Sequence, residues 1–341
     1  MRFSIFTPTA AVVTTLLMTT AMARNPLNHH MNKRIVGGST VSEGKYEFAV
    51  HLTIKTQTTE YLCGGSLLAN NLVVTAAHCM VDADTNQVYE PSQVVICYGS
   101  VNVNKMSCTS ARNITVNNLY NPETYVNDIA LIQISQLKDD SISTVPIYLG
   151  KLPEDTELVT MGWGKTSDSS TVLPSTLMST TIKVGDKKTC GKADSTYKSA
   201  DGPEICSVNA LTPGKDSCSG DSGSPTVITV NGTNYLAGLT STGVDLVHPE
   251  LATCATKDGV AFYTHLAYYR DFIAKVTGLS IDHFDAAETK NYNPETGSDA
   301  SSDDEDGSSS TKSAANALLG SQAMMSSALV AAAAAAAVFA L

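Results

Sequence analysis

The chain has 341 residues, of which 43% are hydrophobic and 16% charged, and its formal net charge at pH 7 is −11. This composition can bury one large all-β domain or two small ones once the ends of the chain are set aside. The acidic balance excludes a nucleic-acid partner, because a phosphate backbone is bound through clustered Lys and Arg side chains.

The N-terminal segment predicts secretion. Residues 1–23 contain an early Arg2, an apolar core from Ala10 to Leu17 and a closing Ala21-Met-Ala23, which is typical of a secretory signal with its cleavage site. A transmembrane anchor is the alternative interpretation, but the apolar run is too short to span a bilayer comfortably. We therefore expect an extracellular protein.

Short runs rich in Val, Ile, Thr and Tyr recur between Gly, Asn and Pro residues along the middle of the chain. This spacing predicts an antiparallel β-barrel or sandwich. The expected strands are Glu47–Ile54, Ser66–Val74, Gln93–Tyr98, Ile129–Ile134, Glu157–Trp163, Thr226–Val230 and Tyr235–Ser241. Helical spacing of apolar residues is confined to Tyr263–Val276.

The C-terminal part changes character twice. Residues 281–313 are polar and include an acidic, Ser-rich run, so we expect a disordered stalk there; binding of a basic partner is the alternative role for such a run. Residues 314–341 end in an alanine-rich run from Ala328 to Leu341, preceded by the small residues Ser313 to Asn316. This layout predicts a glycosylphosphatidylinositol (GPI) attachment signal and hence a lipid anchor at the cell surface. A low-complexity tail or a marginal tail anchor is the alternative.

The stretch from Asp216 to Pro225 places Ser222 between glycines. Because Gly220 and Gly223 lack Cβ, the backbone can turn tightly there and direct N–H groups toward one developing oxyanion. A Gly-Asp-Ser-Gly string alone is equally compatible with an ordinary turn. Two upstream segments favour a catalytic serine, because they supply a base and a carboxylate: Thr75-Ala-Ala-His78-Cys79 and Asn127-Asp128-Ile-Ala-Leu131.

With these motifs the chain resembles the trypsin-like (chymotrypsin-fold) serine endopeptidases from about Ile35 to Thr277. Four motifs match in family order: Ile35-Val-Gly-Gly38 and the segments around His78, Asp128 and Ser222. The resemblance implies a protease domain over residues 35–280, built as two antiparallel six-stranded β-barrels with the active site between them and a C-terminal helix.

The resemblance also implies the roles of the residues. His78 would take the proton of the Ser222 hydroxyl, and Asp128 would hold the imidazole tautomer and stabilise its cation. The N–H groups of Gly220 and Ser222 would form the oxyanion hole. Ser241 would support the buried aspartate and, with Gly243, offer backbone to the substrate.

Substrate class follows from Asp216, which stands where the family places the floor of its primary pocket. A carboxylate there implies cleavage after Arg or Lys. The family's usual Ser-Trp-Gly is Ser241-Thr242-Gly243 here, so the neighbouring subsite should be more open. The pocket glycine is either Gly259 or a position taken by Ala261; in the second case the methyl group would narrow the pocket and weaken trypsin-like cleavage.

The dibasic pair Lys33-Arg34 precedes Ile35 directly, which makes residues 24–34 an activation propeptide. A cut after Arg34 by an activating protease would free the Ile35 amine. By resemblance, that ammonium pairs with Asp221 and orders the oxyanion hole, because a buried carboxylate is costly without a partner.

Eight cysteines in a secreted chain predict disulfides, with 105 possible pairings. The resemblance implies three pairs, and the remaining two cysteines are expected to close a short hairpin-like loop. The expected pairs are Cys63 with Cys79, Cys190 with Cys206, Cys218 with Cys254, and Cys97 with Cys108. Zinc is the alternative, but compact CxxC pairs are lacking, so we expect no metal and no cofactor. Two sequons, Asn113-Ile-Thr115 and Asn231-Gly-Thr233, predict glycosylation on surface loops.

The sequence therefore predicts a secreted or cell-surface serine endopeptidase made as a zymogen, acting as a monomer on proteins or peptides with Arg or Lys, with protein inhibitors as further partners. The main alternative is a catalytically silent homologue that serves as a surface binding or adhesion module. An esterase is the other; such enzymes favour a Gly-x-Ser-x-Gly elbow and the order Ser, Asp, His, which this chain lacks.

Overall fold

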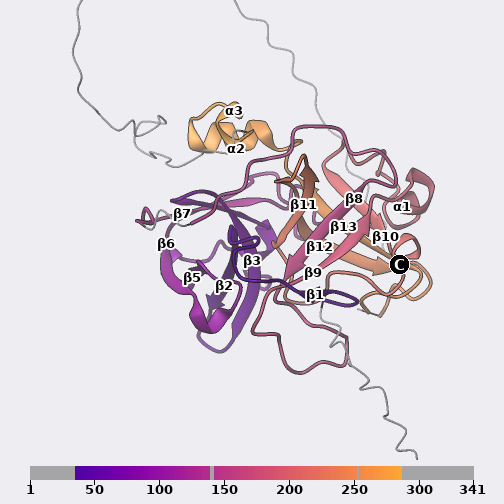
Figure 1. Ribbon diagram of the computed structural model, residues 1–341, viewed down its shortest axis with the longest axis horizontal. Helices are drawn as coiled ribbons and strands as arrows, with labels where there is room; N and C mark the ends of the chain where they lie inside the picture. The colour runs from indigo at the N-terminus through magenta and orange to yellow at the C-terminus, as the bar shows by residue number, and fades with distance from the viewer. Residues whose placement is uncertain (1–34, 139–141, 252, 286–341) are drawn as a thin grey trace, which may run out of the picture. The chain divides into compact units, whose positions relative to one another are not determined.

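The computed structural model describes residues 35–138, 142–251 and 253–285 (Figure 1). The expected signal peptide, the propeptide with Arg34, most of the acidic stalk and the GPI signal lie outside the described residues. Within those ranges the protein is mostly β, as predicted, with two β units. Within them, no helix is long and apolar enough to cross a membrane.

The first unit is a closed six-stranded barrel in the order β2-β3-β4-β7-β6-β5. Its strands are β2 (Ala49–Lys55), β3 (Glu60–Ala69), β4 (Leu72–Thr75), β5 (Val94–Tyr98), β6 (Ser107–Val116) and β7 (Ala130–Ile134). Buried and less buried residues alternate along β2, so one side of the strand faces the barrel core. The single strand expected over Ser66–Val74 is instead two, because the chain turns at Asn70 and Asn71 and pairs back on itself.

The second unit is a seven-stranded antiparallel sheet in the order β1-β9-β8-β11-β12-β13-β10. Its strands are β1 (Ser39–Thr40), β8 (Glu157–Gly162), β9 (Met178–Lys183), β10 (Glu204–Val208), β11 (Pro225–Val230), β12 (Thr233–Asp245) and β13 (Gly259–His265). Asn231 and Gly232, with φ of 52° and 85°, form the turn between β11 and β12. Left-handed values at both positions are what a two-residue hairpin turn requires.

Helices are short: α1 (Lys187–Ala193), α2 (Arg270–Thr277) and α3 (Asp282–Asp285), with 3-10 turns at Ala77–Cys79, Pro91–Gln93, Val103–Lys105 and Asn209–Leu211. The predicted helix over Tyr263–Val276 began too early. Tyr263 belongs to β13, where pairing with β10 and β12 outweighs the local helical spacing, and α2 begins at Arg270.

The folded body also extends past the predicted start of the stalk at Ile281. Phe284 in α3 is 1% exposed and packs into the main hydrophobic core. Its carbonyl accepts a hydrogen bond from the Ile147 N–H at 2.7 Å, within the segment that connects the two β units. The stalk was therefore placed too early, because a polar segment can still anchor itself through one buried aromatic side chain.

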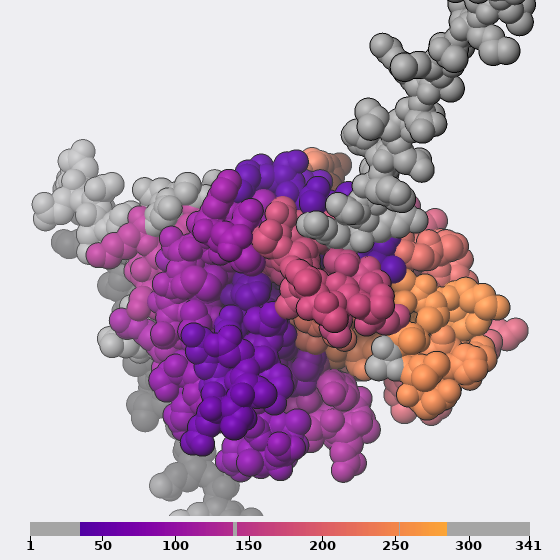
Figure 2. Space-filling view, turned by 90° about the horizontal axis from the view of Figure 1, so that it is seen from below, coloured from indigo at the N-terminus to yellow at the C-terminus, as the bar shows by residue number. Residues whose placement is uncertain are grey.

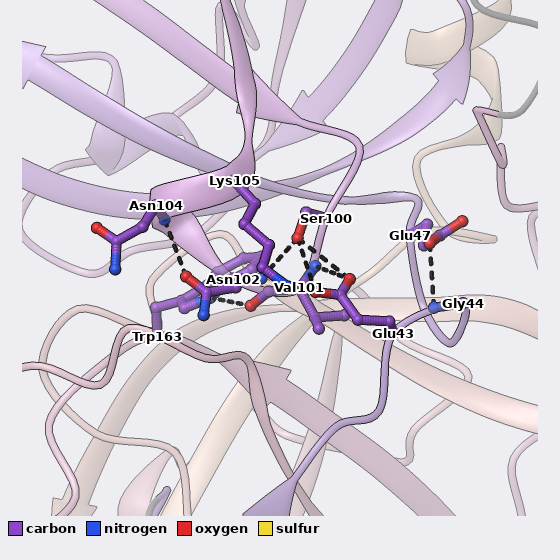
Figure 3. A network of polar contacts seen from close by, with 9 residues as sticks. All are labelled: Glu43, Gly44, Glu47, Ser100, Val101, Asn102, Asn104, Lys105 and Trp163. Atoms are coloured by element: carbon purple, nitrogen blue, oxygen red, sulfur yellow. Dashed lines mark hydrogen bonds and ion pairs between the residues drawn. The ribbon is translucent and has the colours of Figure 1, made fainter.

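The two β units meet along a polar seam beside Trp163 (Figure 3). The Ser100 hydroxyl donates to the Glu43 carboxylate at 3.1 Å, and the Trp163 indole Nε1–H donates to the Val101 carbonyl at 3.1 Å. In Figure 2 the indigo-to-magenta surface of the first unit adjoins the red and orange surface of the second. This seam fixes Trp163, and the next residue, Gly164, reaches the candidate active site.

All four predicted disulfides are confirmed: Cys63–Cys79, Cys97–Cys108, Cys190–Cys206 and Cys218–Cys254. Cys97 and Cys108 lie directly opposite each other on β5 and β6. Of the two sequon asparagines, Asn231 occupies the hairpin turn, whereas Asn113 lies in β6 and not in a loop. Both are exposed.

Candidate active site

His78 and Asp128 lie side by side at the ends of two neighbouring strands of the first barrel. His78 lies in the 3-10 turn after β4, and Asp128 lies two residues before the start of β7, the strand that pairs with β4. The Asp128 carboxylate is buried and accepts two hydrogen bonds from His78, from its backbone N–H and at its Nδ1, both at 2.8 Å. This fixes Nδ1 as the protonated nitrogen and leaves Nε2 free to act as a base.

The second β unit contributes two further donors to Asp128. The Ser241 hydroxyl, on β12, donates to Oδ2 at 2.6 Å, as the prediction of a supporting serine requires. The Thr264 hydroxyl, on β13, donates to the Asp128 backbone carbonyl at 2.7 Å. Asp128 is thus held from both units, which locks its carboxylate in one orientation. Thr264 was missed because only the strand register shows where its hydroxyl points.

Ser222 lies in the loop before β11 and is partly exposed. Its carbonyl accepts a hydrogen bond from the Gly64 N–H at 2.7 Å, which ties the loop to β3 of the first barrel. The next residue, Gly223, has a φ of 74°, and a Cβ there would collide with Thr75 and Ala76, which lead into His78. The serine loop is therefore packed against the histidine segment, and no residue larger than glycine fits at position 223.

The backbone around Ser222 has two unused donors. The N–H groups of Asp221, Gly223 and Ser224 bind carbonyls, whereas among the described residues those of Gly220 and Ser222 have no acceptor. Gly220 adopts a φ of 98°, a left-handed conformation that glycine reaches without strain. Two free N–H groups beside a serine hydroxyl are suited to bind a developing oxyanion.

Asp221 is completely buried. Its carboxylate accepts hydrogen bonds from the N–H groups of Gly164 at 2.7 Å and Cys218 at 2.9 Å. Burial nevertheless raises the pKa of Asp221 to about 7, and the charge of Asp216 adds to the effect. No basic side chain of the described residues forms an ion pair with it.

A cavity of about 200 Å³ opens beside Ser222. Asp216 lines it and is 7% exposed. Its Oδ2 accepts hydrogen bonds from the Asn209 side chain and the Ala255 N–H, both at 2.9 Å, while Oδ1 has no partner among the described residues. Burial raises the pKa of this carboxyl group. A cationic group entering the cavity would therefore find a buried, unsatisfied acceptor.

The strand register distinguishes the two candidates for the pocket glycine. Ala261 is paired directly with Gly243 across β12 and β13, and both line the cavity. Gly259 also lines it, but a Cβ there would collide with the side-chain amide of Asn209, which holds Asp216. Gly259 is thus required by the support of Asp216, and Ala261 supplies the methyl group opposite Gly243.

The Ile35 end of the described chain lies beside this pocket. The Ile35 side chain is fully buried, and the Val36 carbonyl accepts a hydrogen bond from the Asp216 N–H at 3.2 Å. A Cβ at Gly37, where φ is 75°, would collide with the Gly214 carbonyl. The Ile-Val-Gly-Gly motif is therefore docked against the segment from Gly214 to Asp216, five residues before Asp221 in the chain.

Comparison with known proteins gives a consistent set of relatives. The Trypsin family model matches residues 35–273. Trypsin Blo t 3 of Blomia tropicalis is 32% identical over 74% of this chain and 92% of its own length. Transmembrane protease serine 11C of Mus musculus is 30% identical over 77% of this chain and 58% of its own. Mannan-binding lectin serine protease 1 of Homo sapiens is 31% identical over 64% of this chain and 32% of its own length. The chain thus spans only part of the last two relatives.

Proposed function

The chain belongs to the trypsin family of serine endopeptidases, and we propose that it hydrolyses peptide bonds after Arg and Lys. The observation that supports this specificity is the unpaired Oδ1 of Asp216 in the cavity that Ser222 also lines. A guanidinium or ammonium group would satisfy that oxygen and offset the cost of burying the carboxylate.

The proposed mechanism uses His78 as the base. Nε2 takes the proton of the Ser222 hydroxyl as its oxygen attacks the scissile carbonyl, and the N–H groups of Gly220 and Ser222 bind the oxyanion. The imidazolium then returns the proton to the leaving amine, which gives the acyl-enzyme. Water, deprotonated by the same nitrogen, attacks the acyl-enzyme and releases the acid.

The methyl group of Ala261 faces Gly243 in the proposed specificity pocket. A guanidinium is a broad planar fork, whereas an ammonium is compact. We therefore expect the pocket to accept Lys more readily, relative to Arg, than the same pocket with glycine at position 261.

We also propose that the chain is a zymogen, cut after Arg34. The support is the buried Asp221 carboxylate, whose pKa is raised by burial and which has no ion-pair partner among the described residues. The docked Ile35 segment would bring its new ammonium to that carboxylate, which would then stay ionised and hold the Gly220 to Ser222 backbone.

The proposed location is extracellular, with a GPI anchor, a stalk that begins after α3, and glycan on Asn113 or Asn231. Release of active enzyme from cells by a phosphatidylinositol-specific phospholipase would support the anchor. Full-length protein in the medium that retains Leu341 would refute it. A mass loss on deglycosylation, absent after Asn231→Gln and Asn113→Gln together, would locate the glycan.

The central experiment measures turnover of Arg and Lys peptides by protein cleaved after Arg34. Ser222→Ala and His78→Ala are each expected to abolish hydrolysis nearly as completely as the double change, because the two residues act as one unit. An organophosphonate should label the wild-type protein and not Ser222→Ala. Near-normal turnover by either single variant would disprove the triad, and absence of both turnover and labelling would favour a silent binding module.

A further inference from the structure

Glu204 lies on the same face of the second sheet as the hydroxyl that holds Asp128. It begins β10 and is paired directly with Thr264 on β13, in a register without a bulge. Side chains that are directly opposite in an antiparallel pair emerge on the same face, with Cβ atoms about 5 Å apart. Since the Thr264 hydroxyl donates to the Asp128 carbonyl at 2.7 Å, the Glu204 side chain is directed toward the same part of the site.

The surroundings of Glu204 are acidic. The charged groups that act on it are Asp194, which ends α1, and Asp128, and no described basic side chain forms an ion pair with it. Burial, followed by these two negative charges, raises the pKa of Glu204 to about 7. His265, the next residue after Thr264, alternates to the opposite face, where its Nδ1 lies 2.9 Å from the Gly202 carbonyl.

A third element, the start of α2, joins the same cluster. The Tyr269 hydroxyl donates to the Asn127 side chain at 3.3 Å, next to Asp128. Burial raises the pKa of Tyr269, and the charge of Glu204 is the next largest cause. Glu204 is therefore coupled electrostatically to Asp128 and to Tyr269, whose hydroxyl binds the residue before Asp128.

We propose that Glu204 is a second carboxylate of the catalytic machinery, a positioning residue that acts through its charge on the Asp128–His78 pair. This rests on the proposed function of His78, Asp128 and Ser222. As pH rises through neutrality, Glu204 loses its proton to water and adds a negative charge behind Asp128. That charge favours protonated His78, and so stabilises the imidazolium formed when Ser222 attacks.

The expected size follows from Coulomb's law. For two unit charges about 10 Å apart in partly solvated surroundings, it gives about a twofold to fourfold change in a proton-binding constant, and we expect a change of this size at His78. By linkage, protonation of His78 favours ionisation of Glu204 by the same factor.

The decisive test is an NMR titration of His78 in the Ser222→Ala background, which needs no turnover. Glu204→Gln, an isosteric change, should lower the proton-binding constant of His78 about twofold to fourfold. Glu157→Gln, which removes a carboxylate at an exposed position on β8, is the matched control and should change nothing. Identical His78 curves with and without Glu204 would overturn the inference.

A kinetic measurement adds the consequence for activity. In Glu204→Gln the acid limb of kcat/KM should move to lower pH while its plateau falls about twofold to fourfold, and Glu204→Asp should restore the wild-type profile in large part. A lower plateau with an unmoved limb in both variants would reveal a merely structural role and overturn the proposal. The two hypotheses remain distinguishable: turnover that survives Ser222→Ala refutes the proposed triad, whereas the His78 titration alone decides the part played by Glu204.

Discussion

The buried carboxylate of Asp221 should make the stability of the uncut chain depend on pH. The pKa of this carboxyl group is about 7 in the folded protein, against an ordinary value of 3.8 for an Asp side chain. Because the folded pKa is the higher one, the stability is fully present below about pH 4 and is lost as pH rises through 7. A difference of about 3 pKa units corresponds to about 4 kcal/mol in total, of which about 2 kcal/mol is lost between pH 5 and pH 7.

Two uncut precursors isolate this effect. The first carries Arg34→Gln alone, and the second carries Arg34→Gln together with Asp221→Asn. The free energy of unfolding of the first should fall about 2 kcal/mol more than that of the second between pH 5 and pH 7. For a domain of this size, that difference corresponds to about 4–8 °C in the unfolding midpoint. Thermal or denaturant unfolding at matched ionic strength measures it.

Cleavage after Arg34 should abolish the loss of stability that Asp221 causes between pH 5 and pH 7. Once the Ile35 ammonium pairs with Asp221, the carboxylate stays ionised, so the cut enzyme should lose no stability from this group between pH 5 and pH 7. In that state Asp221→Asn should destabilise, because it leaves a buried ammonium without its counter-charge. If the free energy of unfolding depended on pH in the same way for the two precursors, or if cleavage left that dependence unchanged, the reasoning would be refuted.

Three further substitutions test the pocket and the body of the enzyme. Asp216→Ser should lower kcat/KM for Arg and Lys peptides about a thousandfold, because a buried counter-charge is lost, and should shift preference toward apolar side chains. An unchanged preference for Arg in a peptide library would mean that another carboxylate binds the substrate side chain. Ala261→Gly should raise kcat/KM for Arg about tenfold and for Lys less, since it removes one methyl group from the pocket wall; equal gains for both would contradict the steric argument. Phe284→Ala should lower the free energy of unfolding by about 3 kcal/mol, as expected for a buried aromatic side chain, with little change in KM; a loss below 1 kcal/mol would show that α3 is not part of the folded body.

The residues that the sequence predicted best are those whose role depends on local chemistry. A histidine beside a cysteine, an aspartate before an apolar strand and a serine between glycines are recognisable without any tertiary contact, and the structure brings His78, Asp128 and Ser241 together as the resemblance implied. Three of the disulfides followed from the same resemblance, and Cys97 with Cys108 was the pair that remained. Local patterns predict the wrong secondary structure where strand pairing decides the conformation. Tyr263 fits a helical spacing of apolar residues in the sequence, yet it lies in β13.

The residues that the sequence could not assign depend on which side chains are opposite each other. Neither Gly259 nor Ala261 could be identified as the pocket residue until the pairing of Gly243 with Ala261 was known. The same holds for Asn209, whose amide holds Asp216 from a turn. A shift of one residue in β13 would send the methyl group of Ala261 to the opposite face of the sheet.

Glu204 shows why register matters for chemistry as well as for packing. In the sequence it is one acidic residue among many and belongs to no recognisable motif. Only its pairing with Thr264 on β13 turns its side chain toward Asp128. The next position on β10, Ile205, faces the other way and packs beside Tyr263 in the apolar core of the second unit. The same charge placed one residue later would therefore destabilise the fold, whereas at position 204 it can act on the imidazole of His78 through the aspartate that both β units hold.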